Sequence, residues 1–433
     1  MSDSHEQFYI HPRQLRVGMY VHLDLSWMQH PFPLSSFKIK DEAQLNAIQA
    51  IGLEQVRYDP LRSDCEPLPV SGEMPEPEPE VIQVITSLPE AEPIEEDKRK
   101  ARVALLNYAI RECEKSFVKA TNTARQAIQN ITSSPQQAVV EADLLIGEMV
   151  KSILTEGGMV IQAMDGSRLG DDTYCHPLNS IVLAMMVAKA MSMSEEDAHC
   201  LGLAALFHDV GKHEVPDSIL MNTGELSRAE QAFLQQHCEF GADIVLNAGI
   251  SERVAQIIYQ HHELADGSGY PRGLAAADID PLARILSMVN IYDNLCNPVN
   301  VADAMTPYSA LSNMFSNNRK RYDNAMLNTF IKALGVYPPG SIVLLNDGVY
   351  GIVMSVNPQK LLKPVVMLHN RRIERDMPDI LDLGEETDTT ISKCLHANQL
   401  PKDVADYLQC RQRLSYYFSK ASFNDETQEL ENA

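Results

Sequence analysis

The sequence predicts a multidomain protein that is mainly α-helical, with a small α+β module at its N-terminus and a small β unit at its C-terminus. Helical apolar periodicity dominates the middle of the chain, alternating stretches flank it, and a segment rich in proline and glutamate precedes the helices. A chain of 433 residues also fits two to three domains. We expect an N-terminal module over 1–62, a linker over 63–97, a helical domain over 98–337, a β-hairpin unit over 338–385 and an acidic tail over 386–433.

The N-terminal module combines strand and helix patterns. Alternation in LRVGMYVHLDL predicts a strand, DEAQLNAIQAIG a helix, and EQVRYD another short strand. Trp27, Pro31 and Phe32 predict a packed aromatic core, with a ligand or partner surface as the alternative. The Pro/Glu-rich segment that follows predicts a semi-extended linker, which an apolar patch at 81–88 interrupts.

Helical patterns then cover 98–130 and, after a break at Pro135, continue to Thr155. These two long helices could pair between subunits. Further along, the apolar run LGLAALF predicts a buried helix with His208 and Asp209 at its last turn. The glycine at position 211 is expected to end this helix.

Two more helices are expected to carry histidines. A capping box of Ser227 with Glu230 predicts the start of a helix that contains His237 and closes near Gly249. The next begins near Ser251 and ends at a histidine pair. Adjacent helical residues point about 100° apart, so both histidines can face one ion only if the helix frays there.

The C-terminal part is expected to be small and mostly β. SIVLLNDGVYGIVMSV predicts a hairpin whose turn is Asp347 and Gly348, and KPVVML predicts a third strand. We expect a structural cap here. The acidic tail shows one helical stretch, and the sequence indicates no role for it.

Between Gly202 and Pro271 the chain holds five histidines and the strings HDVGK, HHE and DGSGYP. Imidazole nitrogen and carboxylate oxygen together suit iron, manganese or zinc, and a carboxylate can bridge two ions with its two oxygens. Singly, such residues are commonly core, surface or helix-capping groups, but the ordered set favours a binuclear metal site bridged by Asp209. Four histidines, of which one lies within this span, are predicted to be ordinary ones: His199, His213, His369 and His396.

The motifs HDVGK, HHE, DGSGYPRGL and TYCH resemble those of the HD-GYP family over 171–337. This family is a branch of the HD metal-dependent phosphohydrolases whose members hydrolyse the bacterial second messenger cyclic di-GMP. The N-terminal strings VGMYV and WMQHPF also resemble a module of unknown function often found ahead of HD-GYP domains. The resemblance implies an HD-type helical bundle and two, sometimes three, iron or manganese ions, held here by His176, His208, Asp209, His237, His261 and His262.

The resemblance also implies the chemistry. Two close metal ions clamp a phosphodiester and activate a water, so Asp209 and Lys212 are the expected catalytic residues, and Lys212 would neutralise a phosphate oxygen. The products would be pGpG or GMP. The loop offers further substrate contacts, through glycines that allow close approach and an aromatic face for guanine, with a plain turn as the alternative: Gly267, Gly269, Tyr270 and Pro271.

The chain departs from the family after Arg284, which is counted among the substrate-binding residues. Where the family reads ADVYDALTSDRPYR, this chain reads VNIYDNLCNPVNVADA. Asn290 therefore stands at the last metal-binding Asp, and its neutral oxygen would bind metal more weakly, with Asp293 as a partial substitute. The segment 298–302 lacks the arginines that bind phosphate in pairs of hydrogen bonds. Asp172 matches a third-metal carboxylate of some members, although a surface Asp is the favoured interpretation.

Composition restricts the partners. The formal net charge is −23, from 36 Lys and Arg against 59 Asp and Glu, which argues against nucleic acid and anionic membranes. The eight cysteines lack CxxC spacing, which indicates reduced thiols. There is no apolar run of about 18 residues and no signal peptide, so we expect a cytoplasmic protein. Besides the cyclic dinucleotide, a second copy of the chain or signalling proteins are the expected partners.

Three functions remain open from the sequence. The favoured one is a cyclic di-GMP phosphodiesterase. The second is a catalytically weakened receptor or adaptor that binds a cyclic dinucleotide and barely hydrolyses it, which the changes at Asn290 and 298–302 motivate. The third is an HD phosphohydrolase acting on nucleoside mono- or triphosphates, which the GYP loop makes the least favoured.

Overall fold

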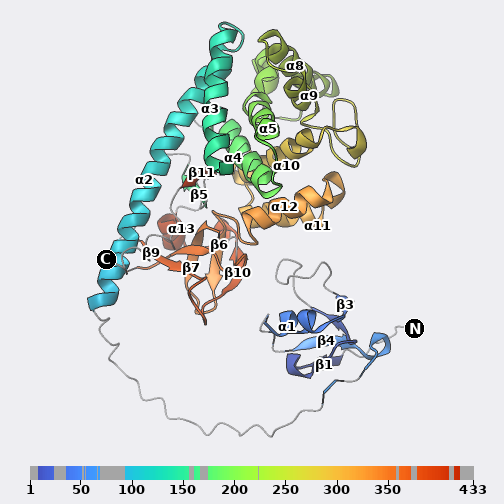
Figure 1. Cartoon of the computed structure of the whole chain (residues 1–433), viewed down its shortest axis with the longest axis vertical. Helices are drawn as coiled ribbons and strands as arrows, with labels where there is room; N and C mark the ends of the chain where they lie inside the picture. The colour runs from blue at the N-terminus through green and yellow to red at the C-terminus, as the bar shows by residue number, and fades with distance from the viewer. Residues whose placement is uncertain are drawn as a thin grey trace. The chain divides into compact units, whose positions relative to one another are not determined.

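In the computed structural model the chain forms two compact units, Met1–Glu90 and Ala91–Ala433 (Figure 1). The division falls within the segment expected as a linker. Three sequence predictions lie outside the described residues: the aromatic group around Trp27, the patch at 81–88, and Asp172. The described residues are 8–23, 36–50, 53, 55–65, 67–68, 93–155, 160–165, 174–222, 224–356, 360–371, 378–408 and 414–419.

The N-terminal unit is an α+β module, as predicted. Its four strands form an antiparallel sheet in the order β1-β4-β2-β3. Met19, Val21 and Val56 pack with Ile48 of the helix into one apolar core. The strand expected along LRVGMYVHLDL is short, because Gly18 turns the chain at a φ of +99° just before it. The elements are β1 (Phe8–Ile10), β2 (Tyr20–His22), β3 (Ser36–Lys38), α1 (Glu42–Ala50) and β4 (Val56–Asp59).

The second unit is a helical bundle followed by a β-sheet, which confirms the predicted fold class. Two long helices pack on each other within the chain, and the pairing between subunits stays a prediction. Helix α4 is apolar on all sides and buried at thirteen of its sixteen positions, so it is the central helix. The helices are α2 (Pro93–Asn130), α3 (Pro135–Thr155), α4 (Cys175–Ala190), α5 (Glu195–Phe207), α6 (Asp217–Leu220), α7 (Arg228–Gln235), α8 (His237–Asn247), α9 (Glu252–Gln260), α10 (Pro281–Cys296), α11 (Pro307–Ser316) and α12 (Asn324–Leu334).

One expected helix is two helices. The capping box of Ser227 with Glu230 starts α7, but α7 ends at Gln235, and His237 opens α8. The imidazole of His237 bonds to the carbonyl of Leu234, one of the last carbonyls of α7 that has no partner within the helix. The side chain thus caps α7, and the prediction of one continuous helix was wrong.

The C-terminal sheet is larger than expected. The hairpin with its turn at Asp347 and Gly348 is confirmed, and Gly348 adopts a φ of +85° there. The antiparallel sheet has five strands in the order β10-β6-β7-β8-β9, and β10 lies in the range expected as a tail. The strands are β6 (Ile342–Leu345), β7 (Tyr350–Ser355), β8 (Val365–Leu368), β9 (Asp379–Asp382) and β10 (Ile391–Leu395).

The rest of the tail also contributes structure. The expected helical stretch is α13 (Lys402–Leu408), and β11 (Leu414–Ser419) pairs antiparallel with β5 (Val160–Asp165). Strand β11 contacts α4 and α2, and the side chain of Tyr416 is fully buried. Strand β11 therefore belongs to the helical core, which the acidic composition of the tail concealed.

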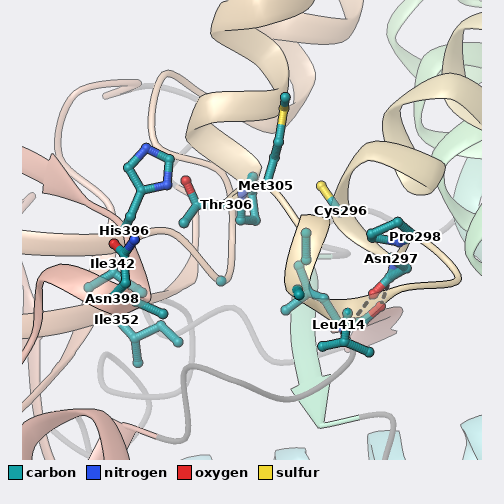
Figure 2. Close-up of a pocket in the computed structure, with 16 residues that line it drawn as sticks. Cys296, Asn297, Pro298, Met305, Thr306, Ile342, Ile352, His396, Asn398 and Leu414 are labelled. Carbon is teal, nitrogen blue, oxygen red and sulfur yellow. Dashed lines mark hydrogen bonds between the residues drawn. The ribbon is translucent and has the colours of Figure 1, made fainter. Parts of the chain in front are cut away.

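A cavity of about 440 Å³ lies where the helices meet the C-terminal sheet (Figure 2). Cys296 and Asn297, at the end of α10, line it together with Leu414 of β11. Strand residues Ile342 and Ile352 line it from the sheet. The changed segment after α10 is thus next to this cavity.

No helix among the described residues is long and apolar enough to cross a membrane. All cysteines in the described ranges are free thiols, and Cys410 lies outside those ranges.

Two glycines test how α3 and α5 pack. A Cβ atom on Gly202 would lie 2.5 Å from Cγ2 of Ile146, whereas a Cβ atom on Gly147 would meet no neighbouring atom of the described chain within 4 Å. We expect Gly202→Val to lower the melting temperature of the helical unit, because overpacking a core costs about 1–3 kcal/mol. The control Gly147→Val should leave it unchanged or slightly higher. Equal shifts of both variants in calorimetry would contradict this packing.

Candidate metal centre

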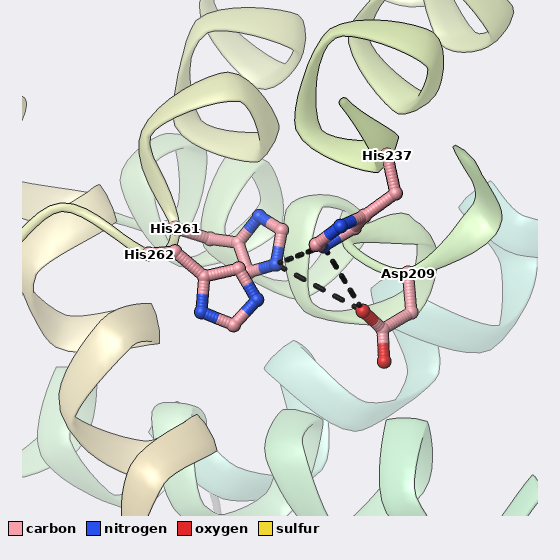
Figure 3. Close-up of side chains that lie close together, drawn as sticks. All are labelled: Asp209, His237, His261 and His262. Carbon is pink, nitrogen blue, oxygen red and sulfur yellow. Dashed lines mark hydrogen bonds and ion pairs between the residues drawn. The ribbon is translucent and has the colours of Figure 1, made fainter. Parts of the chain in front are cut away.

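Helix ends bring the predicted ligands together. His176 lies at the start of α4, Asp209 follows the end of α5, and His237 opens α8. Figure 3 shows Asp209 and His237 facing the pair His261 and His262 at the end of α9. The candidate ligand atoms form two groups, each within 4.8 Å: Asp209, His237, His261 and His262 in one, and His176, His208 and Asp209 in the other.

Asp209 belongs to both groups, and its two oxygens divide between them. Oδ2 lies 3.5 Å from Nε2 of His208 and 3.9 Å from Nε2 of His176. Oδ1 lies 3.6 Å from Nε2 of His237 and 3.9 Å from Nε2 of His261. Oδ1 is also buried without a hydrogen-bond partner. A buried carboxylate oxygen with no hydrogen-bond partner fits the role of a metal ligand, as expected of a bridging residue.

Three of the histidines have their protonated nitrogen fixed by the backbone. In each, Nδ1 faces the carbonyl three residues earlier, in the last turn of the preceding helix. A carbonyl can only accept, so Nδ1 carries the proton and Nε2 is left with a lone pair. Histidine ligands of metals are commonly oriented in this way. The pairs are His208 with Ala205 (2.9 Å), His237 with Leu234 (2.7 Å) and His261 with Ile258 (2.5 Å).

The bare nitrogens face one another. Nε2 of His176 lies 3.1 Å from Nε2 of His208, and Nε2 of His237 lies 3.3 Å from Nε2 of His261. Nδ1 of His176 faces a carboxylate oxygen of Asp293 at 2.6 Å, so it too donates. One of these two contacts lies in each group of candidate ligands, and each group therefore fits one ion.

The protonation states match metal binding. Burial lowers the pKa of His208 to about 4 and also lowers the pKa values of His237 and His261. Burial raises the pKa of the Asp209 carboxyl, but the ammonium of Lys212 and nearby histidines outweigh it and hold this pKa well below its usual range. At neutral pH these three imidazoles are thus neutral and the carboxylate is anionic, the forms that bind metals. At His176 burial also lowers the pKa, but the hydrogen bond to Asp293 and its charge outweigh burial and raise this pKa.

Lys212 contacts the bridge itself. Its Nζ lies 2.7 Å from Oδ2 of Asp209, and its side chain remains 40% exposed. The preceding Gly211 is required by packing, since a Cβ atom there would lie 2.0 Å from the carbonyl oxygen of His237. The Asp209 contact was not predicted, and the phosphate contact of Lys212 stays a prediction.

Glu263 holds the GYP loop, which sequence reasoning missed. Its buried carboxylate accepts hydrogen bonds from the backbone N–H groups of Arg272 (2.7 Å) and Leu274 (2.8 Å). Gly269 packs against the backbone ahead of it, because a Cβ atom there would lie 2.4 Å from the carbonyl oxygen of His262. The signal in the sequence was a charged residue directly after two histidines at a helix end.

Tyr270 stacks on a candidate ligand. Its ring lies 4.5 Å from the ring of His262, with 21° between the planes. One face of Tyr270 is therefore covered by protein, which limits the aromatic surface expected for guanine. Pro271 is exposed, and Gly267 adopts a φ of +78° that favours glycine.

The residues on α10 lie in other contacts. Nη1 of Arg284 donates to Asp323 at 2.9 Å, and no described contact joins Arg284 to the cluster. Asn290 is 2% exposed, and its oxygen accepts from the amide of Asn294 at 2.6 Å. Asp293, considered as a substitute ligand, instead accepts from His176. Ligation by Asn290 stays a prediction.

Comparisons with known proteins agree with this geometry. A family model described as HD domain matches residues 168–326, and one described as a domain of unknown function (DUF3391) matches residues 8–142. The chain is 28% identical over 386 residues to cyclic di-GMP phosphodiesterase PA4108 of Pseudomonas aeruginosa, covering 87% of this chain and 89% of that protein. Residues 168–326 thus match an HD domain, and most of the chain is similar to a cyclic di-GMP phosphodiesterase.

Other relatives match only in part. The chain is 26% identical to the cyclic di-GMP phosphodiesterase response regulator RpfG of Xanthomonas campestris, over 48% of this chain and 54% of that protein. It is 30% identical to 3'3'-cGAMP-specific phosphodiesterase 3 of Vibrio cholerae, over 52% of this chain and 46% of that protein. The chain thus spans about half the length of these two relatives. The solved structure of Bd1817, a HDG"Y"P protein from Bdellovibrio bacteriovorus, aligns with a TM-score of 0.40 at 16% identity, over 75% of this chain and 98% of that one.

Packing of the GYP loop can be tested through metal binding. We expect Gly269→Ala to push the loop off His262 and to weaken Mn²⁺ binding about tenfold or more, since outer partners of metal ligands contribute about 10–100-fold. Ser268→Ala, on an exposed neighbour, is the control. Isothermal titration calorimetry measures both. Equal affinities in the two variants would show that the loop does not support His262.

Proposed function

We propose that this chain is a metal-dependent phosphodiesterase of cyclic dinucleotides, acting on cyclic di-GMP to give pGpG or GMP. The observation that carries the proposal is Asp209, whose two oxygens divide between two histidine groups and one of which is buried without a partner. The names of the relatives, which are phosphodiesterases of cyclic di-GMP or of 3'3'-cGAMP, support the substrate class.

The residues present fit two divalent ions, iron or manganese. Asp209 would bridge, with His176 and His208 on one side and the remaining three histidines on the other. When bound, such ions activate a water for attack on phosphorus and neutralise charge on the phosphodiester. The protein fixes the imidazoles through backbone carbonyls, and Lys212 beside the bridge adds a positive charge where the phosphate would lie.

The negative net charge of the protein means that substrate binding depends on the positive charge at the metal site. The chain carries −23 overall, so its average field repels a dinucleotide phosphate. Attraction must then come from the bound ions and Lys212. The free thiols in the described part of the chain fit the reducing cytoplasm, where a bacterial second messenger would be found.

Two observations favour a second candidate, a weakened enzyme that acts as a cyclic-dinucleotide receptor. Asn290 is neutral and its oxygen is already bonded to Asn294. The segment 298–302 has no arginine or lysine, and Val299 within it is 96% exposed. Such a protein would keep the fold and ligand binding but turn over slowly.

Hydrolysis of cyclic di-GMP by the purified chain with Mn²⁺ or Fe²⁺ tests the proposal. We expect linear pGpG or GMP by chromatography, and loss of turnover on chelation with EDTA. Asp209→Asn should abolish turnover, because it removes the bridging charge. His213→Ala, an exposed histidine beside the same motif, is the control and should retain it. Turnover that survives both EDTA and Asp209→Asn would contradict the metal mechanism. Binding of cyclic di-GMP without turnover would favour the receptor.

The neutral position on α10 gives a separate test. We expect Asn290→Asp to raise metal occupancy or activity, because it adds a negative charge that would attract the ions. Metal content by mass spectrometry and the hydrolysis rate measure this. Asn317→Asp adds the same charge at an exposed site after α11 and is the control. Unchanged occupancy and rate in Asn290→Asp would show that this position does not ligate metal.

A further inference from the structure

Asp293 is a buried carboxylate held by hydrogen bonds from three side chains. Its side chain is fully buried, and no lysine or arginine of the described chain pairs with it. Oδ2 accepts from Nδ1 of His176 at 2.6 Å. Oδ1 accepts from the amide nitrogens of Asn179 (2.8 Å) and Asn297 (2.9 Å). A buried charge of this kind is stable only while these donors stay in place.

The same two asparagines also hold the C-terminal strand. Asn179, in α4, donates to the carbonyl of Leu414 at 3.0 Å and accepts from the N–H of Tyr416 at 2.9 Å. Asn297, directly after α10, donates to the carbonyl of Leu414 and accepts from its N–H, both at 2.9 Å (Figure 2). One edge of β11 pairs with β5, and these side-chain amides satisfy groups on the other edge.

Strand β11 is anchored beside them. The hydroxyl of Tyr416 lies 3.2 Å from that of Tyr292 in α10, and both rings are fully buried. The clamp at Asn297 and Leu414 forms one wall of the cavity described above. A continuous path of direct hydrogen bonds therefore connects β11 with the cluster. The strand bonds to the two asparagine amides, the amides bond to Asp293, and Asp293 bonds to His176.

We propose that β11 is a positioning element of the metal centre, acting through Asn179 and Asn297 on Asp293 and so on His176. This inference rests on the proposed metal function. Asp293 fixes the proton on Nδ1 of His176 and turns Nε2 toward His208, and the two amides fix Asp293. None of the three residues touches the reacting atoms, so they are positioning residues.

The effect falls on one of the two metal positions. The other fixed histidines are oriented by carbonyls at the ends of the preceding helices, independently of β11. Among the described contacts of the candidate ligands, the path from β11 leads to His176, which belongs to the group with His208 and Asp209. Loosening β11 should therefore weaken the ion at this group and leave the ion at the other group in place.

Calorimetric titration of the full-length, metal-free protein with Mn²⁺ tests this. We expect two ions per wild-type chain. In Asn297→Leu and in Asp293→Asn, one of the two should bind about 10–100-fold more weakly, the range typical of lost outer partners. The double variant should be no weaker than the weaker single one, because both changes act along one path. Asn398→Ala, an exposed asparagine lining the same cavity, should bind like the wild type.

A second measurement needs no metal. In the metal-free protein the proton shared by His176 and Asp293 should give a downfield imidazole N–H resonance with protection from exchange. Asn297→Leu should shift or broaden it while the resonances of His208 and His261 stay, a selectivity that general unfolding would not produce.

The outcomes separate the two proposals. A wild-type chain that binds no pair of ions contradicts the proposed function. A wild-type chain that binds two, with two equally tight ions in Asn297→Leu and Asp293→Asn, overturns the role of β11. Additive losses in the double variant, or an unmoved His176 resonance in Asn297→Leu, would overturn it as well.

Discussion

The site depends on one interaction, that of the Asp209 carboxylate with the imidazoles on both sides of it. The carboxylate is held anionic by Lys212 while burial keeps most of the surrounding imidazoles neutral. Oδ1 of Asp209 is buried without a hydrogen-bond partner, and imidazole nitrogens lie on both sides of the carboxylate. These donor atoms fit two divalent ions that share Asp209.

Helix termination is the device that builds this arrangement. The last carbonyls of a helix have no partner among its own N–H groups. At the ends of α5, α7 and α9, a histidine just beyond the helix donates its Nδ1–H to one of these carbonyls. The same bond that caps the helix selects the tautomer and aims Nε2 inward. Local chain geometry and metal chemistry are thus satisfied by the same residues, so the ligands need little support from distant parts of the chain.

His176 differs from these histidines, because the side chain of Asp293, far away in the sequence, orients it. This difference separates what the sequence could predict from what it could not. The helix-end ligands were predictable because each lies beside a motif with a recognisable start or stop, as at Ser227 and Ser251. The split between α7 and α8 was missed, because the side-chain cap at Leu234 has no sequence signature. The role of Asp293 and of β11 was missed too, since it depends on contacts between residues more than 100 positions apart. An acidic tail conceals β11, which pairs with β5 and is also bonded by Asn179 of α4 and by Asn297 just after α10.

The fold class, the two flanking units and the C-terminal hairpin followed from periodicity and turn residues, whereas the five-stranded sheet did not, because β10 shows little apolar alternation.

The central claim is that Asp209 bridges two ions. Anomalous diffraction from crystals grown with Mn²⁺ tests it most directly. The account predicts two manganese peaks per chain, one on each side of the Asp209 carboxylate, with imidazole nitrogens completing both. A single peak, or two peaks that do not share Asp209, would contradict it.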